Sequence, residues 1–557
     1  MKNWRINLLF ILIISFGVVV IGHLVYYQII QKDFYKALAQ GQQKIFNIVK
    51  GERGNIYFNG GEILATNIKA KYVFVCPEEV NDKQYITEEL SRILNIEKEA
   101  LLSKLDKDSL FEKVKSQLTD QEEREIESLD LEGVYLGEAL FRSYPQDSMA
   151  SQVIGFFGGG EMGQYGLEGY YDDLLQGKEL VEQKEKGSIT SFLSSSFNTG
   201  KGADLFLTID YNIQFMAEDL LKGAKQDLNI ESGQIIVMDP LTGKILALAS
   251  YPNFDPNNYS DIEDFDIFQN STIQKLFEPG SGFKPITMAS AIDQNKISPS
   301  TTYVDTGKVT IGEYTIENYN SRVFGEQTMT NVLERSINTG AVFAEKQLGH
   351  DLFLEYIDSF GFFEPTEIDL QGEVFSENKT FKRGYEINFA TASFGQGIEI
   401  TPIQLLRAYS AIANKGKMVN PYIVEEIIGE KYIKVEPEIS SRQVISEKTA
   451  SQVTAMLVSV LENGYSKSAR IPGYYIAGKT GTAQIPWSAL GVDQKGYSDK
   501  TWQSAIGFGP AFEPRFMILV KLDNPGTRTA EYSAIPLFKE LSKYIIDYYH
   551  IPPDYDF

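Results

Sequence analysis

The sequence predicts an α+β protein of several domains, in which a long apolar N-terminal segment precedes two folded domains. The chain has 557 residues, more than one core usually holds, because soluble domains usually run to roughly 100–200 residues. Its 43% hydrophobic and 23% charged residues are typical of folded rather than disordered chain. Strand patterns on both sides of a largely helical middle indicate a sheet closed by segments far apart in the sequence.

The N-terminal segment is predicted to be an uncleaved transmembrane helix. Residues 6–31 contain no Asp, Glu, Lys or Arg, and a bilayer core needs about 20 mostly apolar residues. Lys2 and Arg5 favour a cytoplasmic tail at residues 1–5. A cleaved signal peptide is the alternative, but its apolar core spans only roughly 7–15 residues. We therefore expect a single-pass protein of the cell membrane, with its later domains outside the cytoplasm.

The first folded domain is expected over residues 32–200. Short strands and helices mix there, and residues 84–130 are strongly helical in pattern, with regular apolar positions among many Glu and Lys. A stretch rich in Ser and Gly at 187–202 has the composition of a linker or long loop. The second domain is therefore expected over residues 201–557.

The second domain begins with a predicted strand at 203–209 and a helix at 210–221 that Asp210 could cap. Two apolar runs on either side of residues 239–243 predict a hairpin. The pattern then predicts helices over much of 275–470, strands at 473–484 and 502–522, and an amphipathic helix at about 534–549.

Charge and residue counts disfavour several classes of function. A net charge of -23 disfavours nucleic-acid binding, because an acidic chain repels phosphate backbones. The single cysteine, Cys76, cannot form an intramolecular disulfide and alone makes no metal site. Among three histidines, His23 lies in the apolar segment and His550 near the C-terminus, so a Ser-His-Asp triad would depend on His350. No metal or organic cofactor is expected.

Ser281 is the candidate nucleophile. Pro279 and Gly280 precede it and a periodic apolar run follows, so it is expected at the start of a helix, where Pro285 is tolerated. Lys284 is then its neighbour at i+3 on the same face. A serine hydroxyl needs an adjacent base, and lysine can serve where burial or positive potential favours its neutral amine. The helix N-terminus also offers backbone N–H groups to a developing oxyanion.

Two further segments complete a possible site. Ser336 and Asn338 form a Ser-x-Asn pattern flanked by helical patterns, with a helix break expected at residues 338–340. A hydroxyl and a carboxamide there could relay a proton and bind an amide. Residues 478–484 predict a strand carrying glycines, which often mark close backbone approach, as when an extended substrate adds to a sheet edge. Lys479 in that strand could bind a carboxylate.

Each pattern alone is weak. Residues 376–379 also match Ser-x-x-Lys, and residues 196–198 also match Ser-x-Asn. Together, however, the order Ser-x-x-Lys, Ser-x-Asn, Lys-Thr-Gly is the motif set of penicillin-binding proteins and β-lactamases. The scarcity of histidine agrees with a lysine base. Pro279 rules out the Gly-x-Ser-x-Gly pattern of α/β-hydrolases at Ser281.

The chain resembles the class B penicillin-binding proteins over nearly all of its length. Besides the motifs, similar segments include residues 53–56, 142–145, 166–169, 238–257, 392–397 and 506–525. The resemblance implies a pedestal (dimerisation-type) domain over 32–200. Over 201–557 it implies a β-lactamase-like transpeptidase domain, with a central antiparallel sheet flanked by helices. The chain departs from the family at Tyr57-Phe58, where an Asp-Arg pair is usual, and at Gly282, where Thr is usual.

The resemblance also implies a role for each motif residue. Ser281 would attack the carbonyl of the penultimate D-alanine of a stem peptide, with Lys284 as the general base. Ser336 would pass the proton to the leaving amine, and Asn338 would fix the donor peptide.

The Lys-Thr-Gly strand would bind the end of the donor peptide. Lys479, Thr480 and Thr482 would hold its terminal carboxylate, with Gly481 among the substrate-binding residues. Backbone N–H groups of Ser281 and Thr482 would form the oxyanion hole. β-Lactams would acylate Ser281 and remain attached.

The implied activity is that of a peptidoglycan D,D-transpeptidase, which cross-links stem peptides ending in D-Ala-D-Ala through a serine acyl-enzyme during septal wall synthesis. The compact pedestal and the C-terminal run favour the division type over the elongation type. A polytopic membrane glycosyltransferase and other division proteins are the implied partners. The motifs leave open a β-lactamase or D,D-carboxypeptidase with water as acceptor. The alternative outside the enzymes is a β-lactam sensor or scaffold, which the complete motif set disfavours.

Overall fold

The computed structural model describes residues 51–158, 161–177, 200–429 and 441–556, with short stretches at 14–17, 20, 44–49, 180–185 and 432–433. The anchor predicted at 6–31 lies outside these residues, apart from five positions. Within the described part of the chain, no helix is both long enough and apolar enough to cross a bilayer. The chain divides into two compact units, residues 1–53 with 176–202 and residues 54–175 with 203–557.

In the first unit, β1 (Lys44–Val49) pairs antiparallel with β8 (Leu180–Glu185). Most of the stretch predicted as a linker, residues 187–199, lies outside the described residues.

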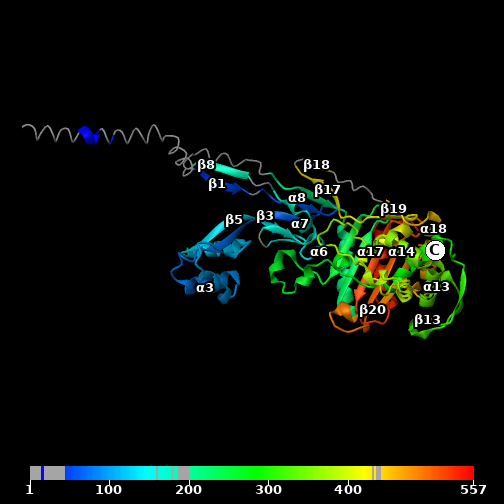
Figure 1. Cartoon of the computed structure of the whole chain (residues 1–557). Helices are drawn as coiled ribbons and strands as arrows, with labels where there is room; N and C mark the ends of the chain where they lie inside the picture. The colour runs from blue at the N-terminus through cyan, green and yellow to red at the C-terminus, as the bar shows by residue number, and fades with distance from the viewer. Residues whose placement is uncertain are drawn as a thin grey trace, which may run out of the picture. The chain divides into compact units, whose positions relative to one another are not determined.

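In the second unit, one sheet joins strands from distant parts of the chain (Figure 1). Its order is β18-β17-β9-β2-β3-β4, with β5 also paired to β3. The strand predicted at 203–209 is confirmed as β9, which pairs with β2 and with β17. The strands are β2 (Ile56–Tyr57), β3 (Ile63–Val75), β4 (Glu112–Lys115), β5 (Val134–Ser143), β9 (Asp204–Leu207), β17 (Val424–Ile428) and β18 (Tyr432–Ile433).

The helical pattern predicted at 84–130 is confirmed for three helices, which share a small core with β3 and β4. They are α3 (Lys83–Leu94), α4 (Lys98–Leu105) and α5 (Asp120–Leu129). The prediction is wrong at β4, which adds to the edge of β3. In that strand only Val114 among four residues is buried, so the segment is too short and too polar to show a strand period.

A buried ion pair joins three segments of the chain near β5. Arg142 Nε lies 2.7 Å from Glu168 Oε1, with side-chain exposures of 3% and 0%. Arg142 Nη1 donates to the carbonyl of Gly54 at 2.7 Å. The short elements around it are α6 (Ser151–Ile154), β6 (Phe156–Gly158), β7 (Met162–Gln164), α7 (Gly166–Tyr170) and α8 (Asp172–Leu175).

The second sheet is five-stranded and antiparallel, in the order β11-β10-β22-β21-β20. The predicted hairpin is confirmed as β10 and β11. The run predicted at 502–522 forms two strands, β21 and β22, that pair with each other. Strand β20, which lies far along the chain from β10 and β11, is an edge strand, so one side of its backbone faces away from the sheet. The bounds are β10 (Ser232–Met238), β11 (Ile245–Tyr251), β20 (Ala477–Pro486), β21 (Tyr497–Gly509) and β22 (Phe516–Asp523).

Helices pack against this sheet as two groups, and the helices within each group contact one another. The first group holds α9 (Tyr211–Leu228) and α19 (Ala534–Tyr548), and the second holds α11 (Lys284–Asp293), α17 (Pro402–Ala413) and α18 (Glu447–Asn463). The Asp210 cap is confirmed, because its side chain accepts from the N–H groups of Asn212 and Ile213. The α+β prediction with an antiparallel sheet between helices is therefore confirmed.

The middle of the domain also contains short strand pairs that the helical pattern did not predict: β12 (Thr302–Asp305) with β15 (Gly325–Thr328), β13 (Lys308–Ile311) with β14 (Tyr314–Glu317), and β16 (Lys417–Val419) with β19 (Ser441–Gln443). Its remaining helices are α10 (Ser271–Gln274), α12 (Met329–Glu334), α13 (Asn338–Leu348), α14 (His350–Ser359), α15 (Lys379–Lys382) and α16 (Glu386–Ala392).

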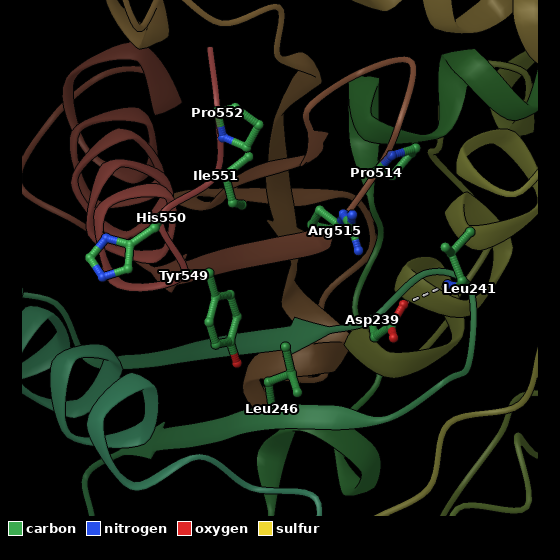
Figure 2. Close-up of a pocket in the computed structure, with 9 residues that line it drawn as sticks. All are labelled: Asp239, Leu241, Leu246, Pro514, Arg515, Tyr549, His550, Ile551 and Pro552. Atoms are coloured by element: carbon green, nitrogen blue, oxygen red, sulfur yellow. Dashed lines mark hydrogen bonds between the residues drawn. The ribbon is translucent and has the colours of Figure 1, made fainter. Parts of the chain in front are cut away.

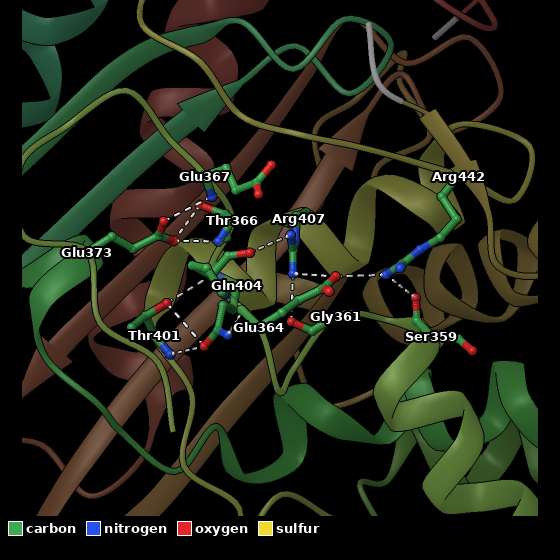
Figure 3. Close-up of polar contacts among 11 residues, drawn as sticks. Ser359, Gly361, Glu364, Thr366, Glu367, Glu373, Thr401, Gln404, Arg407 and Arg442 are labelled. Carbon is green, nitrogen blue, oxygen red and sulfur yellow. Dashed lines mark hydrogen bonds and ion pairs between the residues drawn. The ribbon is translucent and has the colours of Figure 1, made fainter. Parts of the chain in front are cut away.

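Helix α17 is buried along its whole length and supports the segment after Ser281. Thr401 and Gln404 form a capping box at its start, and Arg407 donates to the carbonyl of Gly361 at 2.6 Å (Figure 3). Tyr409 on the same helix donates its hydroxyl to the carbonyl of Gly282 at 2.7 Å. The helix thereby fixes the backbone one residue beyond Ser281.

Candidate active site

Ser281 lies where the sequence predicted it, at the start of a helix. A 3₁₀ turn, η5 (Gly280–Phe283), leads directly into α11. Ser281 is partly exposed, whereas its neighbours Gly280 and Gly282 are buried. Gly280 has a φ of +53°, and a Cβ there would lie 3.0 Å from the carbonyl oxygen of Thr482. Glycine is therefore needed for both the backbone conformation and the close approach to β20.

Lys284 is fully buried at the centre of the site. Its Nζ donates to the carbonyl of Ser336 at 2.6 Å, to Asn338 Oδ1 at 2.9 Å and to Ser336 Oγ at 3.3 Å. All three acceptors are neutral. Burial, and then the nearby charge of Lys479, hold the pKa of Lys284 well below its usual range. The site therefore favours the neutral amine that a general base requires.

Ser336 lies between the two lysines. Lys284 Nζ is 3.3 Å and Lys479 Nζ is 3.1 Å from its Oγ. Ser336 has a φ of +54°, a conformation rare for a residue with a side chain. Such strain often marks a functional site.

The helix break predicted at 338–340 is wrong. The break falls between α12 and α13, at Arg335, Ser336 and Ile337, and Asn338 begins α13. Gly340 lies inside the helix, where a Cβ would be 2.3 Å from a methyl group of Val332. The glycine that suggested a break instead permits close packing of α12 and α13.

Lys479 projects from β20 and is 2% exposed. Its Nζ donates to Ser336 Oγ and, at 3.0 Å, to the carbonyl of Thr480. Burial lowers the pKa of Lys479 to about 8, and the charge of Glu531 partly opposes this shift. An ammonium group held beside threonine hydroxyls at the edge of a strand is suited to binding a carboxylate.

Gly481 is the point at which β20 passes the Ser281 segment. A Cβ there would lie 2.4 Å from Ser504 Oγ and 2.6 Å from the carbonyl oxygen of Pro279. The close backbone approach predicted from the glycines is therefore present. Thr482, one residue on, accepts from the N–H of Ala530 at 3.4 Å through its Oγ1.

The structure brings the three motif segments together, but the expected contact between the Ser281 hydroxyl and the Lys284 amine is not formed. Within the described part of the chain, Ser281 Oγ forms no hydrogen bond, and Lys284 Nζ is directed instead at Ser336 and Asn338. Catalytic hydrogen bonds are often long in a free enzyme and tighten when substrate binds.

Two acidic residues of the site were not singled out by the sequence. Burial raises the pKa of Glu278 to about 7, and the hydroxyl of Tyr497 donates to its Oε2 at 3.0 Å. Glu531 Oε1 accepts from Thr480 Oγ1 at 3.4 Å, across 51 positions of sequence. No motif spans that separation, so only the fold reveals the contact.

The competing motif matches take no part in this arrangement. In the second Ser-x-x-Lys match, the exposed Lys379 pairs with Glu377 at 2.9 Å, and residues 196–198 lie outside the described residues. His350 Nδ1 lies 2.6 Å from Glu345 Oε1 and its ring stacks on Phe389, away from the motif residues. Across the described ranges, no group of three or more His, Cys, Asp or Glu side chains could hold a metal.

A separate pocket of about 480 Å³ contains none of the motif residues (Figure 2). It lies where the β10–β11 turn, the segment before β22 and the C-terminal residues meet, and its lining includes the polar residues Asp239, Arg515, Tyr549 and His550.

Comparisons with known proteins identify the family. Residues 233–543 match the penicillin binding protein transpeptidase domain, and residues 48–205 match the penicillin-binding protein dimerisation domain. Stage V sporulation protein D of Bacillus subtilis is 34% identical over 543 residues, covering 94% of this chain and 82% of that protein. Peptidoglycan D,D-transpeptidase FtsI of Escherichia coli is 28% identical over 571 residues, covering 99% and 93%.

Solved structures agree. Penicillin binding protein 3 of Mycobacterium tuberculosis in complex with aztreonam is 25% identical, covers 91% of this chain and 98% of its own, and has a TM-score of 0.70. The chain belongs to the class B penicillin-binding proteins and carries their dimerisation and penicillin-binding transpeptidase domains. The domain bounds at 32–200 and 201–557 and the roles of the site residues stay predictions.

Proposed function

We propose that this penicillin-binding protein cross-links peptidoglycan stem peptides in septal wall synthesis, anchored in the cell membrane with its transpeptidase domain outside the cytoplasm. The main support for this serine acyl-transfer chemistry is that Lys284 is fully buried and that its three hydrogen-bond acceptors are all neutral. A lysine held this way can take a proton at neutral pH.

In the acylation step, Ser281 Oγ attacks the carbonyl carbon of the penultimate D-alanine, and its proton passes to Lys284. The backbone N–H groups of Ser281 and Thr482 bind the oxyanion. An ester bond to Ser281 forms, the peptide C–N bond breaks, and the terminal D-alanine leaves as an amine. Ser336, in contact with both lysines, passes the proton to that amine.

Substrate binding is assigned to the edge of β20. The donor peptide lies along that strand, with its terminal carboxylate near Lys479 and the hydroxyls of Thr480 and Thr482. Gly481 lets β20 approach the Ser281 segment closely, which brings the donor peptide near the nucleophile, and Asn338 binds a donor amide. An amine of a second stem peptide then attacks the ester and releases Ser281. A β-lactam mimics the donor and leaves a stable ester on Ser281.

The test uses the full-length chain in detergent with a fluorescent penicillin, intact mass and peptide mapping. Ser281→Ala is expected to abolish labelling, whereas Ser376→Ala, in the other Ser-x-x-Lys match, is expected to label normally. Labelling that persists in Ser281→Ala would contradict the proposal. Rapid hydrolysis of a chromogenic β-lactam would favour a β-lactamase, and absence of any adduct would favour a sensor or scaffold.

The septal role is supported by the 28% identity to FtsI, and a fluorescently tagged chain is expected to gather at midcell. Uniform labelling of the lateral wall would favour the elongation type. A polytopic glycosyltransferase and other division proteins are the proposed partners, which in vivo crosslinking from the N-terminal segment would identify.

A role confined to sporulation is a second candidate, because the 34% identical relative is a stage V sporulation protein. Presence of the protein in vegetatively dividing cells would count against it.

A further inference from the structure

Glu531 places a carboxylate beside the hydroxyl that is assigned to the substrate carboxylate. It belongs to a 3₁₀ turn, η9 (Ala530–Tyr532), that precedes α19. Thr480 Oγ1 donates to Glu531 Oε1 at 3.4 Å, and Ser466 Oγ lies 3.3 Å from the same hydroxyl. The Thr480 hydroxyl has only one proton. While it donates that proton to Glu531, it cannot donate it to a substrate carboxylate.

The charge of Glu531 also acts on Lys479. It opposes the effect of burial on the pKa of that lysine, so the two groups interact although no ion pair between them forms. Glu531 is half-buried, and none of the ion pairs in the described part of the chain includes it. The Glu531 carboxylate therefore borders the anion-binding groups without an ion-pair partner among the described residues.

We propose that Glu531 is a specificity-determining residue that competes with the substrate carboxylate for Lys479 and Thr480. The inference rests on the carboxylate-binding role proposed for those two residues. An incoming donor or β-lactam must turn the Thr480 hydroxyl away from Glu531 and bind against its charge. The same repulsion favours departure of the released D-alanine, whose carboxylate occupies that place, before the acceptor arrives.

The position of the turn does not depend on the Glu531 side chain. The N–H of Ala530 donates to Thr482 Oγ1 at 3.4 Å, and the buried Ser533 donates to Gln503 Oε1 at 2.5 Å. Replacing the carboxylate by an amide of the same shape therefore removes the charge and leaves η9 against β20.

The experiment compares acylation by benzylpenicillin with acylation by its methyl ester, which lacks the carboxylate charge. Rates are measured by intact mass on the full-length chain at about pH 6, where a lysine with a pKa near 8 stays protonated. Glu531→Gln is expected to accelerate acylation by benzylpenicillin about fivefold and to leave the ester rate unchanged. The gain is expected to shrink partly at about 0.5 M salt, because salt screens a half-buried charge less than an exposed one.

Two variants serve as controls. Glu540→Gln removes the same charge from an exposed position of α19 and is expected to change neither rate. Glu531→Asp retains the charge and is expected to keep the wild-type ratio of acid to ester rates. An Asp variant that behaves like Gln would overturn the proposal.

The outcomes separate this inference from the proposed function. Wild-type acylation at Ser281 with an unchanged acid-to-ester ratio in Glu531→Gln would overturn the role of Glu531 alone. Equal slowing of both reactions would also overturn it, because it would show that Glu531 supports the fold of the site. Failure of the wild type to be acylated at all would contradict the proposed function, and the inference with it.

Discussion

Lys284 Nζ lies 2.6 Å from the main-chain carbonyl oxygen of Ser336, so the candidate base is held by a segment far from it in the sequence. The same amine also contacts Asn338, the first residue of α13. Lys284 thus links the Ser-x-x-Lys helix to the Ser-x-Asn loop. Because none of these partners is a carboxylate, no opposite charge among them offsets the effect of burial, which lowers the pKa of Lys284.

Replacing Lys284 is expected to remove most of the acylation activity. Lys284→Met keeps much of the buried volume but has no base, so the second-order rate constant for fluorescent penicillin should fall about 10³-fold. The rate constant of Lys284→Arg should fall by a similar factor, because a guanidinium stays protonated and cannot act as a base. Thermal unfolding would verify that both variants fold. A folded variant that is acylated within tenfold of the wild-type rate would show that another group takes the proton.

The acylation rate is expected to pass through a maximum with pH. The rate rises on the acidic side as Lys284, whose pKa is depressed, loses its proton and becomes a base. It falls near pH 8 as Lys479 loses the positive charge assigned to the substrate carboxylate. Measured with fluorescent penicillin, the alkaline fall should move to higher pH in Lys479→Arg. A wild-type rate that keeps rising above about pH 9 would indicate an ordinary lysine pKa for the base.

The sequence was sufficient to predict the sheet between helices and the three motif segments that the fold brings together, because the motifs combine local spacing with residue chemistry. It misplaced the break after α12, since the glycine at position 340 serves helix packing rather than a helix end. It gave no indication of Glu531, whose contact with Thr480 depends on how η9 meets β20. Contacts made only by tertiary packing leave no local pattern in the sequence.

The buried pair of Arg142 and Glu168 is expected to be important for stability. Glu168→Gln removes one partner and leaves a buried, uncompensated guanidinium, which should cost about 3–5 kcal/mol of unfolding free energy. Urea unfolding of the full-length chain measures the loss. Glu89→Gln, which breaks an exposed pair with Arg92, is the matched control and should leave stability unchanged. If Glu168→Gln lost as little unfolding free energy as Glu89→Gln, the pair of Arg142 and Glu168 would contribute little to stability.

Gly481→Ala is expected to lower acylation with less effect on stability. The added Cβ would meet the Ser504 hydroxyl and the carbonyl of Pro279. To relieve this contact, β20 must move away from the Ser281 segment, which widens the proposed substrate-binding site. We expect acylation by fluorescent penicillin to fall at least about tenfold, since small misplacements in a site can cost 10²-fold. Gly223→Ala, in helix α9 with nothing near its Cβ, is the control and should stabilise the protein by about 1 kcal/mol. An unchanged acylation rate in Gly481→Ala would show that the approach of β20 to Ser281 is not needed for reaction.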